Sequence, residues 1–349
     1  MHLTSGGASP PGSGTTRPKH RRLGLTVLAT ASVLGLLATS CGTSTFVKLT
    51  GVTTCNLTPA NSFWRSDVTG LPVHASSEAW KANARIRNDG SVQEKLKADF
   101  GAGLYEGDFM GIPYNVVPGN QPKVPVAFSD YEDESDPGPY PIKPGSLIEG
   151  VNGDGDRHLL TFDKDNCILY ETGNTYSDGH GGWEATGGSK WDMKTNAMRT
   201  PGWTSSDAAG LPILPGLIRY EEFASPIGIR HAIRVTVPRT ASIYHWPASH
   251  KAGTGAIATT PPMGGWLRLK PGAYATVDPS MKPILDALKK YGAVIADNGS
   301  ALYMTGVPDS RWNNDKLQTL GNIKISDFEF VNTASLKVAD NSYQSTTAH

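Results

Sequence analysis

Residues 157–171 read RHLLTFDKDNCILYE, with two short apolar runs on either side of the polar segment DKDN. Asp and Asn side chains hydrogen-bond to their own backbone in tight turns, so DKDN predicts a reversal of the chain. Each flanking run has the length and the residue types of a β-strand. We therefore expect a β-hairpin at residues 157–171, near the centre of a mostly β protein.

Composition supports a loop-rich β protein. The 349 residues include 39 Gly and 25 Pro, and only 18% are charged. Collagen is excluded because no Gly-X-Y repeat is present, and a coiled coil because the chain is not dominated by Ala, Glu, Lys, Leu and Arg. Eight prolines between residues 111 and 151 rule out helix interiors and central strands there. We expect that segment to wrap a core as extended chain.

Further strands are expected outside the central hairpin. Residues 217–220 and 231–237 predict a strand pair, and residues 266–269 predict another strand because their side chains alternate. Asn298-Gly299 is a strong turn signal, so residues 293–305 predict a second hairpin.

Helices are expected to be few and short. Residues 279–291 predict one, because Asp278 precedes the first turn, apolar residues share one face and Gly292 follows. Shorter helices are expected at residues 76–85 and 309–321. The sequence thus predicts a single β-rich domain, built as a β-sandwich or jelly roll with one or two short C-terminal helices.

The first 41 residues predict a targeting segment. Four basic residues precede an apolar run at 23–38, and small residues lead to Cys41. This order is typical of a signal peptide, and the small residues before Cys41 resemble a bacterial lipoprotein signal with lipidation at Cys41. Plain secretion or an uncleaved anchor are the alternatives. We expect a tether at 42–62, the domain at 63–332 and a polar tail at 333–349.

Charge and cysteine content agree with an extracytoplasmic location, either at the cell surface or secreted. Removal of residues 1–41 leaves 28 basic against 32 acidic residues, a net charge of −4, which disfavours nucleic-acid binding. Membrane contact is expected only through the lipid anchor. With Cys41 lipidated, Cys55 and Cys167 are the remaining pair, and an oxidising compartment permits their disulfide. Two buried thiols are the alternative.

Carboxylates concentrate at residues 130–136. Crowded acids repel, so Asp133 or Asp136 is a candidate general acid of a glycoside hydrolase. Hydrolysis of a glycosidic bond needs a second carboxylate across the cleft. We select Glu171 for that role, and the other candidates are Asp192, Asp207, Glu221 and Glu222. A solvated acidic loop is the alternative.

Cofactors are not expected, apart from a weak indication of calcium. Residues 130–136 supply oxygen ligands, and residues 152–156 (NGDGD) resemble the opening of a calcium loop but lack its later Gly and Glu. A metal held by histidines stays open.

Histidine and aromatic side chains supply the other candidates. His231 and His250 are candidate catalytic residues, and one of them is expected to position substrate; His231 or Tyr244 is the base if the enzyme is a polysaccharide lyase. Candidate substrate-binding residues are His158, Trp183, Trp191, Tyr244 and Trp246, because aromatic faces beside polar groups suit sugar rings. The alternative is that the histidines are structural and most of the tryptophans fill the core.

Three stretches resemble those of a group of secreted microbial proteins. They are ESDPGPYP at 134–141, GWTSSDAAGLPILPGL at 202–217 and ADNGS at 296–300. With residues 244–250, the similarity spans roughly residues 63–332. The resemblance implies one intact extracellular module, and it carries over neither an activity nor a catalytic residue.

Together these features predict a carbohydrate-active protein that acts on a cell-wall or environmental polysaccharide or oligosaccharide, with glycoside hydrolysis as the favoured reaction. Motifs of nucleotide-binding proteins, zinc proteases and Gly-x-Ser-x-Gly hydrolases are missing from the sequence. The alternatives are a non-catalytic envelope lipoprotein that binds a glycan or a partner, and a polysaccharide lyase.

Overall fold

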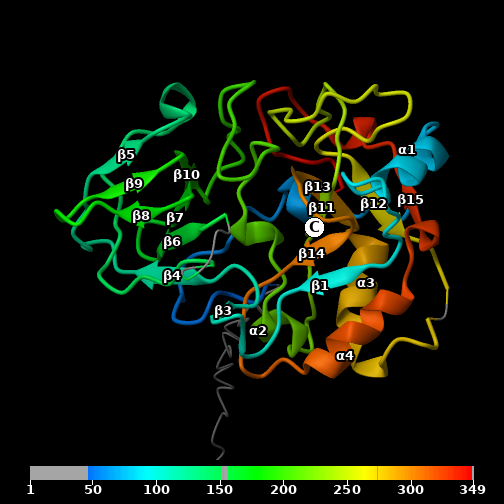
Figure 1. The fold of residues 1–349 in the computed structure, drawn as a ribbon, viewed down its shortest axis with the longest axis horizontal. Helices are drawn as coiled ribbons and strands as arrows, with labels where there is room; N and C mark the ends of the chain where they lie inside the picture. The colour runs from blue at the N-terminus through cyan, green and yellow to red at the C-terminus, as the bar shows by residue number, and fades with distance from the viewer. Residues whose placement is uncertain (1–45, 151, 153–155, 273, 348–349) are drawn as a thin grey trace, which may run out of the picture. The chain divides into compact units, whose positions relative to one another are not determined.

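The computed structural model describes residues 46–150, 152, 156–272 and 274–347. These residues form several β-sheets with a few short helices (Figure 1). The largest sheet has six strands in the order β1 (Lys97–Asp99), β14 (Tyr303–Thr305), β11 (Ile233–Val237), β13 (Ala293–Asn298), β12 (Trp266–Leu269) and β15 (Phe328–Phe330). The predicted signal segment lies outside the described residues.

Strand β11 lies in the middle of this sheet, and its position overturns two predictions. It pairs in parallel with β13 and antiparallel with β14, so it separates the two strands that were expected to form a hairpin around Asn298-Gly299. Residues 217–220 do not form its partner strand either. Ile218 makes a single bridge to Gly306, and helix α2 (Tyr220–Phe223) follows.

The predicted hairpin at 157–171 is confirmed. The second sheet has the strand order β10 (Gly187–Asp192), β7 (Ile168–Gly173), β6 (Leu159–Asp163) and β4 (Tyr114–Val117). Strands β6 and β7 are antiparallel, with Phe162 opposite Leu169. The Asp163 carboxylate accepts from the main-chain N–H groups of Asp165 and Asn166, which closes the turn as expected.

The proline-rich segment contributes strands only at sheet edges. Besides β4, it supplies β5 at one side of a small sheet, where a missing N–H group is tolerated. The small sheets are β5 (Val126–Phe128), β9 (Trp183–Ala185) and β8 (Tyr176–Ser177), together with the pair β2 (Leu104–Tyr105) and β3 (Asp108–Phe109). Parallel pairs occur in three of the sheets, and a jelly roll is not confirmed.

The helices are α1 (Ser77–Ala84), α2, α3 (Lys282–Lys290) and α4 (Asn314–Gln318). Short 3-10 turns lie at Phe63–Arg65, Glu132–Glu134, Leu214–Gly216, Pro279–Met281, Thr319–Asn322, Ile325–Asp327 and Ala334–Leu336. Helix α3 confirms the helix predicted at 279–291, with Ile284 and Leu288 buried on one face. Within the described part of the chain, no helix has the length and apolar character that spanning a membrane requires.

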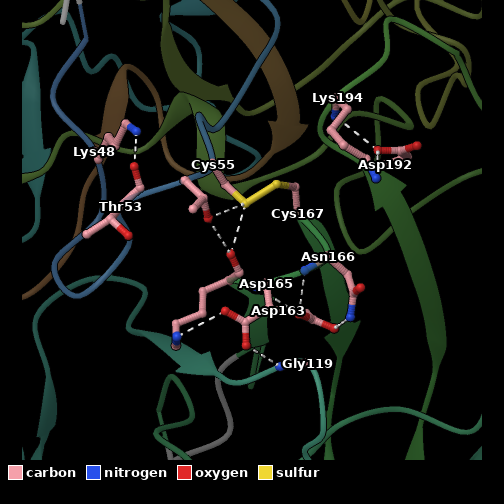
Figure 2. The surroundings of a disulfide bond; sticks show 12 residues. Lys48, Thr53, Cys55, Gly119, Asp163, Asp165, Asn166, Cys167, Asp192 and Lys194 are labelled. Atoms are coloured by element: carbon pink, nitrogen blue, oxygen red, sulfur yellow. Dashed lines mark hydrogen bonds and ion pairs between the residues drawn. A yellow bond between two sulfur atoms is a disulfide. The ribbon is translucent and has the colours of Figure 1, made fainter.

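A disulfide joins the N-terminal segment to the central hairpin (Figure 2). The Cys55 and Cys167 Cα atoms lie 5.5 Å apart, and the bond closes a loop across a sequence separation of 112. The predicted pairing is therefore confirmed. Residues near the C-terminus also join the core, since the Leu336 and Tyr343 side chains are buried and the Phe63 N–H donates to the Tyr343 carbonyl.

Candidate functional site

A cavity of about 490 Å³ lies between helix α1, the start of β12, the chain after β15 and the loop at 244–249. We call it the aromatic cleft and define it by His74, Trp80, Tyr244, His245, Trp246 and Asn332. Its volume falls in the usual range for small-ligand sites. The predicted substrate-binding residues Tyr244 and Trp246 both line it.

Backbone hydrogen bonds to the end of β15 and to the segment just before β12 hold the two histidines of the cleft. The His74 N–H donates to the Phe330 carbonyl at the end of β15 (2.8 Å), and the His245 N–H donates to the Met263 carbonyl (2.9 Å). Gly264 has a φ of +76°, and a Cβ atom there would lie 2.0 Å from the His245 carbonyl oxygen. Only glycine therefore allows the loop to approach β12 this closely.

Aromatic rings form the walls of the cleft. The His74 and Trp80 rings are stacked with centroids 4.0 Å apart, and Trp80 is buried with its indole N–H donating to the Ile257 carbonyl. Trp246 is half-buried and its indole N–H donates to the Ser342 carbonyl. Tyr244 is 37% exposed. The cleft thus combines a fixed apolar floor with an accessible phenol.

Several polar atoms of the cleft have no partner among the residues that the structure describes. His74 Nδ1 accepts from the Ser76 N–H, which leaves the proton of the neutral ring on a free Nε2. Within the described chain, neither ring nitrogen of His245 forms a hydrogen bond, and the Tyr244 hydroxyl forms none either. Asn332 accepts from the Ala334 N–H through Oδ1, so its amide N–H group is free to donate.

Both imidazoles of the cleft are biased toward the neutral form. Burial lowers the pKa of His74. Burial, and then the nearby His74, lowers the pKa of His245, whose ring centroid lies 6.1 Å from that of His74. At neutral pH the cleft therefore presents two neutral imidazoles: His245 can accept one hydrogen bond and donate another, and His74 can donate one through Nε2.

The charged residues along the cleft are paired. The Arg199 guanidinium contacts the Asp136 carboxylate and the Glu134 carbonyl, and its Nε donates to the Thr204 carbonyl. Lys337, which also lines the cleft, forms an ion pair with Asp340. Among the described residues that line the cleft, Asp340 is the only carboxylate.

A second group of titratable residues lies where the two large sheets meet. We call it the ionic junction: Glu149, His158, Asp207, Arg234 and Asp297. Arg234 on β11 donates two hydrogen bonds to the Asp207 carboxylate, at 2.8 and 2.7 Å, and its third nitrogen donates to Thr305. Its Nη2 also lies 3.3 Å from Asp297 on β13. Arg234 and Asp207 are fully buried.

His158 links this network to the second sheet. It immediately precedes β6, and its ring contacts the Glu149 carboxylate on one side and the Ser206 carbonyl on the other (3.0 Å). Ser206 is followed by Asp207, so one loop binds His158 and Arg234 together. The ionic junction therefore fastens the central hairpin to the six-stranded sheet.

The surroundings shift the pKa values of two junction carboxylates, Asp297 and Glu149, in opposite directions. Burial, and then the Asp207 charge, raises the pKa of Asp297 to about 7. Burial acts in the same direction on Glu149, but the His158 charge and hydrogen bond outweigh it and lower the pKa of Glu149. Burial also opposes protonation of His158, and the Glu149 carboxylate overcomes it and raises the pKa of His158 to about 9.

Glu171 and Trp191 lie together in the interior, and neither lines the aromatic cleft. The Glu171 carboxylate accepts from the N–H groups of Ile213 and Leu214 and from the Trp191 indole, all at 3.0–3.1 Å. Burial raises the pKa of Glu171 to about 7 despite these backbone donors. The carboxylate thus holds the 202–217 loop against β7.

The other predicted catalytic residues do not meet in the cleft. His231 is buried beside Glu222, with 2.8 Å between His231 Nε2 and Glu222 Oε1, against a cavity of only about 20 Å³. His250 Nδ1 contacts the Ala208 carbonyl at 2.7 Å.

The two acidic candidates also lie outside the cleft-lining set. Asp136 is bound by Arg199 and the Lys190 N–H, and Asp133 lies in an exposed 3-10 turn.

Trp183 on β9 is half-buried against a small core group that includes Tyr140, which places it away from the cleft-lining residues. The calcium loop expected at 152–156 lies partly outside the described residues. In the part of the chain that is described, no three His, Cys, Asp or Glu side chains are grouped so as to hold a metal ion.

Sequence reasoning missed His74, His245 and Asn332 in the cleft and Glu149, Arg234 and Asp297 in the junction as site residues. The only local signal for the cleft was the His-Trp-Pro run at 245–247. Comparisons of the chain with protein-family models, with curated proteins and with solved structures found no match.

Proposed function

We propose that this chain is an extracytoplasmic carbohydrate-active protein and that a segment of a polysaccharide or oligosaccharide occupies the aromatic cleft. The observation that carries the proposal is a cavity of about 490 Å³ with aromatic walls and free polar atoms. Sugar rings have apolar C–H faces and polar edges, so they match a site that offers both kinds of contact.

The disulfide supports the location, because such bonds persist in oxidising compartments. Export through the signal segment, with lipidation at Cys41 as the only membrane attachment, is part of the same proposal. The net charge of −4 after loss of residues 1–41 argues for a glycan rather than a nucleic acid as the partner.

Glycan binding is tested by titrating neutral and acidic oligosaccharides into the protein and into a Tyr244→Ala variant. The Tyr244 side chain is 37% exposed and its hydroxyl has no hydrogen-bond partner within the described residues, so the variant should keep the fold. Loss of one stacking contact should weaken affinity by roughly tenfold. Tyr105→Ala, which removes an exposed tyrosine on β2, is the matched control. Equal binding by the wild type and Tyr244→Ala would contradict the proposal.

A glycoside hydrolase centred on the ionic junction is the second candidate. Its supporting observation is that Asp297 and Glu149, both within electrostatic reach of Arg234, have pKa values displaced in opposite directions. Such a division is what a general acid and an ionised partner need. New reducing ends that disappear in Glu149→Gln and Asp297→Asn would support this candidate.

A further inference from the structure

The aromatic cleft has the wrong residues for hydrolysis by two carboxylates. Of the described residues that line it, only Asp340 carries a carboxylate, and Lys337 neutralises that group at the rim. The Asp136 carboxylate contacts the guanidinium of Arg199, which lines the cleft, whereas Glu134 contacts that guanidinium only through its main-chain carbonyl. A reaction in this cleft must therefore use other acids and bases.

The free groups of the cleft suit proton transfer. His245 has two ring nitrogens without partners in the described chain, and its neighbour Tyr244 has a free hydroxyl. The neutral state of His245 at neutral pH follows from its burial beside His74. A neutral imidazole is a general base, and a phenol is a proton donor.

A general base without a second carboxylate restricts the possible substrates. Neutral sugars have no C–H group acidic enough for an imidazole to remove the proton. A uronate does, because its C5–H lies beside the carboxyl group, which can accept the charge that develops when the proton leaves. The His74 Nε2–H and the Asn332 amide are cleft groups, without a partner in the described chain, that can donate to that carboxyl group.

We propose that the cleft cleaves uronate-containing polysaccharides by β-elimination, with His245 as the base and Tyr244 as the acid. His245 takes the C5 proton, and the electrons of the C5–H bond form a C4=C5 double bond as the C4–O bond breaks. The departing oxygen receives the Tyr244 proton. No water and no redox partner enter the reaction, and the two residues return to their starting states by proton exchange with solvent.

This inference rests on glycan binding in the cleft, and its test separates the two claims. The full chain is incubated with polygalacturonate, alginate or hyaluronan, and with a neutral glucan. Binding is measured by titration, and products are measured by the ultraviolet absorbance of the new double bond and by reducing ends. We expect absorbance and reducing ends to rise together for at least one uronate polymer and not for the glucan.

His245→Gln and Tyr244→Phe should each lower the rate by at least about 100-fold, as loss of a general acid or base does. His180→Gln, at an exposed histidine between β8 and β9, should leave the rate unchanged. Tyr244→Phe removes only an exposed hydroxyl, so it keeps the test valid if His245→Gln fails to fold. Binding of a uronate polymer without formation of the product double bond would overturn β-elimination. So would new reducing ends without the ultraviolet absorbance of that bond, or full activity of both variants. Absence of any glycan binding would overturn the proposed function as well.

Discussion

In the ionic junction, Arg234 donates to Asp207, Thr305 and Asp297, and His158 lies between Glu149 and the Ser206 carbonyl. In the aromatic cleft, His245 and Tyr244 have no side-chain hydrogen bonds within the described chain. Both regions are rich in titratable groups, but the junction satisfies them internally, whereas the cleft leaves the His245 ring and the Tyr244 hydroxyl without a partner in the described chain. A buried charge needs internal partners, whereas a ligand site must keep some polar groups available.

This contrast assigns stability to the junction and ligand chemistry to the cleft. The junction joins β6 to β11 through one loop, so its loss should loosen the contact between the two large sheets. The cleft has a rigid floor in Trp80, and its accessible groups contribute few internal contacts. Variants in the two regions should therefore separate into those that change the free energy of unfolding and those that change binding or rate.

The largest effect on stability is expected from Asp207→Ala. Removal of this carboxylate leaves the buried Arg234 guanidinium without its bidentate partner, which should lower the free energy of unfolding by about 3–5 kcal/mol. Asp286→Ala, which breaks the exposed pair with Lys282, is the control and should cost at most about 1 kcal/mol. Denaturant unfolding measures both. Equally small losses of unfolding free energy in Asp207→Ala and Asp286→Ala would show that the junction does not link the two large sheets.

A smaller change in the free energy of unfolding is expected when pH changes, and the titratable groups of the two regions contribute to it with opposite signs. The pKa of Asp297 is raised from 3.8 to about 7 and that of His158 from 6.5 to about 9. Their stabilising contributions are complete below pH 3.8 and 6.5 and are lost as pH rises through 7 and 9. The lowered pKa values of His74 and His245 act the other way, because the unfolded chain gains protons first as pH falls below 6.5.

Thermal unfolding between pH 5 and 9 tests whether Asp297 and His158 lose their stabilising contributions as pH rises. Asp297→Asn should reduce the loss of stability between pH 5 and 7 and leave the loss above pH 7, which belongs to His158. The pKa of Glu149 is lowered, so its stabilising contribution is lost only as pH falls toward and below 4.5, opposite to the behaviour of Asp297. An unchanged slope in Asp297→Asn would mean that its carboxyl group is not held protonated by the junction.

The local elements could be predicted from sequence because neighbouring residues determine them. The turn at 163–166 and the amphipathic helix α3, with Asp278 capping the 3-10 turn before it, both depend on side chains a few positions apart. Strand order could not be predicted in this way. Asn298-Gly299 is a turn, but β11 enters between the two flanking strands from a distant part of the chain.

The same distinction explains the site residues. Tyr244 and Trp246 stood out because aromatic and polar residues are adjacent in sequence there. His74, His245 and Asn332 come from three separate segments, and only the packing of α1 and the chain after β15 brings them together. Glu171 was selected for its charge, and its burial against the backbone of Ile213 and Leu214 depends on the long loop at 202–217.

The contrast between the two regions places the proposed ligand site in the aromatic cleft and not in the ionic junction. A crystal structure of the protein with a bound uronate oligosaccharide tests it most directly, with His245→Gln used to keep the substrate intact. We predict a sugar ring against Trp246 and Tyr244, with its carboxyl group within hydrogen-bond distance of His74 or Asn332. An oligosaccharide bound instead between Glu149 and Asp297, with the cleft empty, would show that the junction and not the cleft is the ligand site.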